Sequence, residues 1–268
     1  MPSQTVLEFA SHTDIGLVRS HNEDAIAICP DESLVILADG MGGYNAGEVA
    51  SQMSVDIVAR QIKQMRGSTW FPHLPWQTSV PMKWIRDAVT MANTQVIDQA
   101  NQNPDNFGMG TTIVVALCYL DRLVIGHVGD SRAYRFRDSN LELITHDHSV
   151  LQSQIDAGLI TPAEAQFSPI KNLITRAVGS SDDIDVEVHD HAMQANDIYM
   201  LCSDGLTDML DHIQIQLVLR ELGNDLDTCC KTLVYLANRQ GGLDNISVVL
   251  FRVKELHERR FMEYIFAS

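Results

Sequence analysis

Three apolar segments of this sequence each run into a turn that contains an aspartate. They are residues 35–38 before Asp39, 124–129 before Asp130 and 199–202 before Asp204. A fourth aspartate, Asp244, stands just before the apolar segment 246–253. Short apolar runs bounded by Gly and Asp are typical of buried strands. If these strands are neighbours in packed sheets, their ends bring four carboxylates together.

Carboxylates that lie side by side repel one another unless they are protonated or share a bound cation. The five cysteines show no C-x-x-C spacing, and His146 and His148 are a His-x-His pair without a further ligand. We therefore interpret these histidines as loop residues and expect Mg²⁺ or Mn²⁺ rather than Zn²⁺. A single Asp-Gly after an apolar run is equally typical of an ordinary turn, so the inference depends on the repetition.

The formal net charge of the chain is -16. This surplus makes nucleic acid a poor partner, because binding to phosphates requires a basic surface. It suits divalent cations, although solubility alone would also explain it. No segment approaches the roughly 20 apolar residues that span a bilayer, and residues 1–10 lack the features of a signal peptide. We expect a cytoplasmic protein.

Apolar periodicity predicts both helices and strands. Between positions 49 and 65 apolar residues recur every three or four positions, which predicts a helix, and Asn45 with Glu48 has the form of its capping box. Residues 67–82 contain three prolines and two tryptophans and are expected to form a loop. The other predicted elements are strands at 5–10, 25–29, 112–119, 122–128, 133–136, 141–144 and 246–253, and helices at 84–97, 149–157, 161–164, 211–222 and 226–239.

No linker, repeat or low-complexity tract divides the chain. We therefore expect a single domain over residues 1–254, followed by a C-terminal tail at 255–268. Little apolar surface supports residues 147–179, and low burial means low local stability. We expect this segment to be a mobile flap that contributes to substrate specificity, since binding residues concentrate on loops over a rigid scaffold.

Six short motifs follow one another in a fixed order along the chain. They are Thr13-Asp14-x-Gly16-x-x-Arg19-x-x-Asn22-Glu23-Asp24, Asp39-Gly40-Met41-Gly42-Gly43, Gly110-Thr111-Thr112, Gly129-Asp130-Ser131-Arg132, Ser203-Asp204-Gly205-Leu206-x-Asp208 and Gly242-x-Asp244-Asn245. The series resembles that of the metal-dependent serine/threonine protein phosphatases of the 2C type (PPM family), bacterial branch, over about residues 8 to 253. The resemblance implies an α+β fold: an αββα four-layer sandwich of two mainly antiparallel sheets flanked by helix pairs.

The resemblance also implies roles for individual residues around a centre of two Mn²⁺ or Mg²⁺ ions. Asp39 would bridge the two ions, the Gly40 carbonyl would bind one of them, and Asp204 and Asp244 would bind the other. Glu23 and Asp24 would hold water at the ions. Asp130 and Asp208, with Asp204, would form a weaker third site. Arg19 would bind the substrate phosphate.

Elementary chemistry supports these residue types. Two neighbouring cations lower the pKa of a shared water and stabilise charge on the attacking and leaving oxygens. Glycine at position 40 lets its carbonyl approach a cation closely. Arginine offers a planar fork for two phosphate oxygens, although Arg19 taken alone could equally form a surface ion pair. Animal members of the family have a histidine where this chain has Met41, and methionine cannot donate a proton to the leaving group.

These observations predict a phosphatase that removes phosphate from serine and threonine of proteins and opposes a bacterial Ser/Thr kinase. The alternative is a catalytically silent protein on the same fold that binds phosphoproteins or a regulatory partner. None of the expected metal ligands is missing from the sequence, which favours the enzyme. We expect a monomer.

Overall fold

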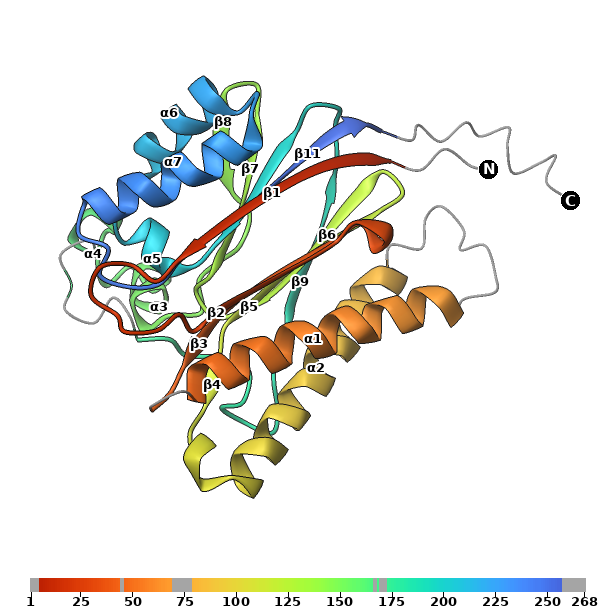
Figure 1. Cartoon of the computed structure of the whole chain (residues 1–268), viewed down its shortest axis with the longest axis vertical. Helices are drawn as coiled ribbons and strands as arrows, with labels where there is room; N and C mark the ends of the chain where they lie inside the picture. The colour runs from red at the N-terminus through yellow and green to blue at the C-terminus, as the bar shows by residue number, and fades with distance from the viewer. Residues whose placement is uncertain (1–4, 44–45, 69–78, 166–167, 169–172, 257–268) are drawn as a thin grey trace, which may run out of the picture.

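The computed structural model describes residues 5–43, 46–68, 79–165, 168 and 173–256. Over these residues the chain forms two antiparallel sheets packed face to face (Figure 1). The first sheet has the order β1 (Val6–Asp14), β11 (Ile246–Glu255), β10 (Ile198–Cys202), β7 (Arg132–Arg137) and β8 (Asn140–Leu143). The second has the order β2 (Asp24–Cys29), β3 (Leu34–Met41), β5 (Ile113–Tyr119), β6 (Arg122–Val128) and β9 (Glu187–Ala192), with β4 (Gly110–Thr111) paired to β3.

A pair of helices covers the outer face of each sheet. In Figure 1, α6 (His212–Leu222) and α7 (Leu226–Arg239), drawn in blue, lie on the first sheet, while α1 (Ala46–Ser68) and α2 (Ser79–Gln102), in orange and yellow, lie on the second. Each helix pair shares a hydrophobic cluster with its sheet, and a third cluster fills the space between the sheets. The predicted αββα sandwich is therefore confirmed.

Local sequence explains most turns and helix ends. Leu120, at the tip of the β5–β6 hairpin, has φ 59°, and Asp138 and Ser139 between β7 and β8 have φ 51° and 63°, so both tight turns lie at the predicted positions. Asp211 and Gln214 cap α6 reciprocally. The capping box predicted at Asn45 lies outside the described residues.

Several boundaries differ from the predictions. Both ends of the loop expected at 67–82 are helical instead, because α1 continues to Ser68 and α2 begins at Ser79; residues 69–78 lie outside the described residues. Pro81 lies in the first turn of α2, where a backbone N–H has no helical acceptor and proline is tolerated. Trp70 and Trp76 lie outside the described residues. Strand β9 was not predicted, because its sequence Glu-Val-His-Asp-His-Ala is mostly polar and its pairing with β6 is what places it in the sheet.

The strand that carries Asp39 does not end at that residue, as the sequence suggested. It continues through Met41, because Gly40 and Met41 pair with the short strand β4. Asp204 does not lie in a simple turn either, since it begins the short helix α5 (Asp204–Thr207).

The end of the predicted flap belongs to the core. Val178 is fully buried, and it exchanges backbone hydrogen bonds of 2.8 and 3.0 Å with Thr111. The flap also contains α3 (Val150–Asp156) and α4 (Pro162–Ala165). Most of the predicted tail, residues 257–268, lies outside the described residues. Among the helices that are described, none has the length and apolar character needed to cross a membrane.

Candidate metal centre

The predicted aspartates meet at one end of the sandwich and come from both sheets. Asp24 and Asp39 are directly opposite each other on β2 and β3. Burial raises the pKa of Asp39 well above its ordinary value, and nearby negative charges raise it further. Those charges belong to Asp24, Asp204, Asp130 and Asp244. The carboxylates therefore lie close enough to interact, as the sequence predicted.

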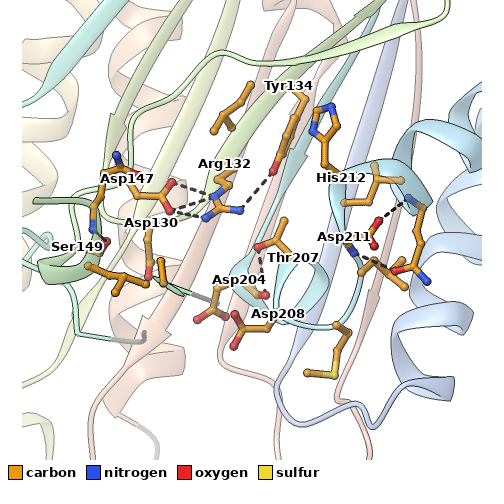
Figure 2. Close-up of a pocket in the computed structure, with 18 of the residues that line it drawn as sticks. Asp130, Arg132, Tyr134, Asp147, Ser149, Asp204, Thr207, Asp208, Asp211 and His212 are labelled. Atoms are coloured by element: carbon orange, nitrogen blue, oxygen red, sulfur yellow. Dashed lines mark hydrogen bonds and ion pairs between the residues drawn. The ribbon is translucent and has the colours of Figure 1, made fainter. Parts of the chain in front are cut away.

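Asp204 lies in a similar environment at the start of α5. Its pKa is raised well above the ordinary value by burial first and then by other carboxylates. These are Asp130, Asp208, Asp244 and Asp24. Figure 2 shows Asp204 and Asp208 side by side at one end of a cavity, with Asp130 close to them. All six aspartates named in advance are thus brought into one cluster.

Asp24 has one carboxylate oxygen that no hydrogen bond from the described residues compensates. Burial raises the pKa of Asp24 to about 6. Its Oδ2 accepts a hydrogen bond of 2.9 Å from the Ser203 hydroxyl, but its Oδ1 is buried and has no hydrogen-bond partner among the described residues. Buried carboxylate oxygens without partners are costly unless a cation compensates them. The donors are all oxygen atoms, so the cluster fits hard divalent cations such as Mg²⁺ or Mn²⁺.

Glu23 and Gly40 are held by a close approach of helix α1. A Cβ atom on Gly40 would lie 2.2 Å from the carbonyl oxygen of Gly47, and one on Gly47 would lie 2.7 Å from Glu23 Oε1. Both positions therefore require glycine for packing. Glu23 Oε1 is buried without a hydrogen bond in the described part of the chain, and His21 Nε2 lies 3.4 Å from it.

Arg19 lies at the edge of the carboxylate cluster. Its guanidinium forms an ion pair of 2.6 Å with Asp244 Oδ2, and about half of its side chain is exposed. The hydrogen bond to Asp244 raises the pKa of Arg19. The loop that carries it is fixed by a 2.7 Å bond from the Leu17 amide to the Gly242 carbonyl. An exposed guanidinium beside the carboxylates can reach an anion bound there.

Other motif residues position the carboxylates rather than extend the cluster. Thr112 Oγ1 accepts a 3.1 Å hydrogen bond from the Asp39 amide and lies 2.7 Å from the Ser131 hydroxyl. The Thr111 hydroxyl donates to the Asp39 carbonyl at 2.8 Å. Asn245 accepts from the Glu23 amide at 2.8 Å. In the sequence, Thr111, Thr112 and Asn245 are recognisable only as parts of motifs, whereas their contacts in the structure support the carboxylates.

The cavity beside the cluster has a volume of about 640 Å³. Asp130, Asp204 and Asp208 line one end, and side chains of β7, β8, α3, α5 and α6 are among those that line the rest (Figure 2). Inside it Arg132 forms a two-pronged ion pair with Asp147, with contacts of 2.6 to 3.1 Å. Asp147 begins the predicted flap. Its negative charge also contributes to raising the pKa of Asp130 to about 6.

Met41 supplies no proton donor to the centre, and a Cβ on Gly110 would lie 2.9 Å from its terminal methyl group. His146 is a loop residue, as predicted, and pairs with Asp156 at 3.2 Å. His148 is also in the loop, but it is buried and contacts Gly129, just after β6, and Glu187 of β9, which its sequence neighbourhood does not indicate.

A buried carboxylate cluster at one end of an αββα sandwich is suited to a metal-dependent hydrolase. Residues 11–231 match the family model described as Protein phosphatase 2C. The chain therefore belongs to the protein phosphatase 2C family.

Relatives of known name agree with this assignment. The chain is 34% identical over 242 residues to the serine/threonine phosphatase stp of Listeria welshimeri, which covers 89% of this chain and 92% of that protein. It is similar to the crystal structure of the serine/threonine phosphatase Stp1 from Staphylococcus aureus, with TM-score 0.84, 33% identity and coverage of 95% and 98%. It is also similar to the catalytic domain of the serine threonine protein phosphatase PstP in complex with two manganese ions, with TM-score 0.81, 35% identity and coverage of 94% and 100%.

Proposed function

We propose that this protein is a Mn²⁺- or Mg²⁺-dependent phosphatase that hydrolyses phosphoserine and phosphothreonine in proteins. The burial of Asp39 and Asp204 among four further aspartates supports it most strongly. A cluster of this kind is stabilised by cations, and hydrolysis of a phosphate ester benefits from them. Membership of the protein phosphatase 2C family and the two manganese ions of the PstP catalytic domain support the same function.

The predicted residues would hold the ions as follows. Asp39, the Gly40 carbonyl, Asp204 and Asp244 would hold two ions, and Asp130 and Asp208 with Asp204 a third, weaker one. When bound, the ions supply a water of lowered pKa and neutralise charge that develops on phosphate oxygens. Glu23 and Asp24 would orient water by accepting its hydrogen bonds.

Arg19 is proposed to bind the substrate phosphate. Its guanidinium offers two parallel N–H donors, which match two phosphate oxygens. Its exposed position beside Asp244 supports this function, because a phosphate brought to the cluster would lie within its reach. Binding the phosphate at two oxygens would orient the phosphorus towards the attacking water.

Substrates are proposed to be phosphoproteins modified by a Ser/Thr kinase. The cavity between the carboxylates and α3 supports a binding place for the peptide around the phosphorylated residue, and the flap at 147–179 forms part of its wall. We further propose that the chain acts as a single domain, as a monomer and in the cytoplasm.

Hydrolysis of a phosphothreonine peptide, measured with Mn²⁺ and with a chelator, tests the proposal. We expect activity only with the cation and its loss in Asp39→Asn and Asp204→Asn variants. Activity that survives chelation or these substitutions would refute it. Absence of both Mn²⁺ binding and hydrolysis would instead favour the alternative, a silent phosphoprotein-binding protein on the same fold.

A further inference from the structure

A second group of ligand-type side chains lies outside the carboxylate centre. One ligand atom each from His127, His148 and Glu187 lie within 4.8 Å of one another. His127 on β6 is directly opposite Glu187 on β9, and His148 approaches from the loop before α3. His189, two residues along β9, places its Nε2 2.7 Å from Glu187 Oε1. None of these side chains has a function in the proposed hydrolysis.

His127 has a nitrogen lone pair without a hydrogen-bond partner among the described residues, and its ring stacks on that of His148 with centroids 4.7 Å apart. Its Nε2 lies 2.9 Å from the His146 carbonyl, which can only accept, so the ring proton must be on Nε2. Its Nδ1 is then unprotonated, and it is buried without a hydrogen-bond partner in the described part of the chain. The whole side chain is buried, and burial lowers its pKa to about 4, which keeps the ring neutral. A neutral imidazole nitrogen is a good ligand for a transition metal.

His148 and Glu187 complete the set. His148 Nδ1 accepts a 3.2 Å hydrogen bond from the Gly129 amide, so its Nε2 carries the proton and faces Glu187 Oε2 at 3.1 Å. Burial raises the pKa of Glu187, but hydrogen bonds from His148 and His189 outweigh burial and lower the pKa overall. The carboxylate is therefore ionised, and each of its oxygens accepts a hydrogen bond from one histidine.

Among the described residues that contact His148, Arg176 is the one whose positive charge opposes a cation here. Its Nη1 lies 3.2 Å from His148 Nε2, and since both atoms carry protons this contact is not a favourable hydrogen bond. The side chain is 41% exposed and already pairs with Asp185 at 3.0 Å. It can move towards Asp185 without losing a charged partner.

We propose that His127 Nδ1, His148 Nε2 and a Glu187 oxygen form a binding site for a borderline divalent cation of the Zn²⁺ type, with His189 as a candidate fourth ligand. Two or three imidazole nitrogens with one carboxylate oxygen match the preference of Zn²⁺ or Co²⁺, whereas Mg²⁺ prefers oxygen alone. Binding requires the ring proton of His148 to move from Nε2 to Nδ1, so that Nε2 can bind the cation while the imidazole stays neutral. This tautomer gives up the hydrogen bond that Nδ1 accepts from the Gly129 amide.

The site would connect three parts of the fold. The His148 amide donates to the Gly129 carbonyl at 2.9 Å, and its carbonyl accepts from the Thr175 amide at 2.7 Å. A cation held by His148, β6 and β9 would therefore fix the base of the flap and the turn that precedes Asp130.

Titration of the full chain with Co²⁺ in excess Mg²⁺ tests the site. The Mg²⁺ occupies the carboxylate centre, whose ligands are oxygen atoms. Co²⁺ bound by nitrogen ligands in a tetrahedral site absorbs strongly in the visible. We expect one equivalent of Co²⁺ to give this absorption, and Zn²⁺ to displace it. His148→Gln and Glu187→Gln should each weaken binding at least about 10-fold, by analogy with the loss of groups that support metal sites.

Two variants serve as matched controls. His146→Gln alters a nearby exposed imidazole, and Asp204→Asn alters the carboxylate centre; both should retain the absorption. Loss of the signal in Asp204→Asn, or its retention in Glu187→Gln, would overturn the proposal. Circular dichroism checks folding, and because Glu187 is partly exposed, its variant decides the outcome if His148→Gln does not fold.

Discussion

Arg19 and Asp244, 225 residues apart in the chain, form an ion pair of 2.6 Å at the edge of the carboxylate cluster. Asp244 Oδ1 accepts a further 2.8 Å bond from the Asn245 amide, so both of its oxygens are engaged. A cation held by Asp244 would compete with Arg19 for this carboxylate and would weaken the ion pair. The guanidinium would then be available to an anion.

Replacing Arg19 by alanine should lower kcat/KM for a phosphothreonine peptide. Hydrogen bonds to charged groups contribute about 1.5 to 3 kcal/mol, which corresponds to a loss of roughly 10- to 150-fold. Lysine should restore little, because it has no planar fork. Arg86→Ala, at an exposed position of α2, is the control and should leave kcat/KM unchanged. Equal kinetics of the Arg19 and Arg86 variants would contradict the proposed function of Arg19.

Replacing Asp39 by asparagine should raise the stability of the cation-free protein and reduce the stabilisation that a cation provides. In EDTA the variant should melt higher than the original protein, because one of several mutually repelling buried carboxylates is removed. With Mn²⁺ it should gain less stability than the original, because a ligand is lost. Thermal unfolding under the two conditions measures this. Asp98→Asn on the exposed face of α2 should change neither value, and a gain from Mn²⁺ equal to that of the original protein would argue against ligation by Asp39.

Replacing Gly40 by alanine should destabilise the protein. The added Cβ would lie 2.2 Å from the Gly47 carbonyl, so β3 and α1 must separate. Such overpacking costs about 1 to 3 kcal/mol, or a decrease in Tm of roughly 2 to 4 °C per kcal/mol for a chain of this size. Gly43→Ala is a matched control, since a Cβ there has no atom within 4 Å. Similar Tm values for the two variants would contradict the packing argument.

His127 should make stability depend on pH. Burial lowers its pKa from 6.5 to about 4, so between these values the unfolded chain binds more protons than the native protein. Stability from this group is therefore complete above about pH 6.5 and is lost as pH falls towards 4, by at most about 3 kcal/mol. Urea unfolding at several pH values measures the slope.

A His127→Gln variant should show a smaller increase of unfolding free energy with pH in this window. Asp24 and Asp130, whose pKa values are raised to about 6, contribute with the opposite sign because they bind protons in the native state. The comparison of variant and original protein isolates the histidine. His146→Gln should keep the original slope, and an unchanged slope in His127→Gln would refute the assignment.

Much of the fold and of the carboxylate cluster could be predicted because the relevant patterns are local. Apolar runs mark β3, β5, β6, β10 and β11, and an aspartate at or beside the end of a buried strand indicates where the cluster forms. The resemblance to a known motif series then gave each aspartate an expected function. The structure brings six of these aspartates together, namely Asp24, Asp39, Asp130, Asp204, Asp208 and Asp244, and their individual functions stay predictions.

The remaining features depend on contacts that no local pattern shows. Strand β9 has a polar sequence and is recognisable only through its pairing with β6. The same pairing brings Glu187 to His127, and the loop adds His148, so three residues spread over the chain form one group. The packing of α1 against Gly40 could likewise not be predicted from the sequence, because glycine next to an aspartate is also typical of a turn.

The carboxylates belong to different layers of the sandwich: Asp24 and Asp39 to one sheet, Asp204 and Asp244 to the end of the other. The distance between them is therefore set by the side chains that separate the sheets, such as Leu37. A change of volume in this interlayer should alter cation affinity without touching a ligand. The thickness of the hydrophobic layer between the sheets thus sets the spacing of the cation-binding carboxylates at its edge.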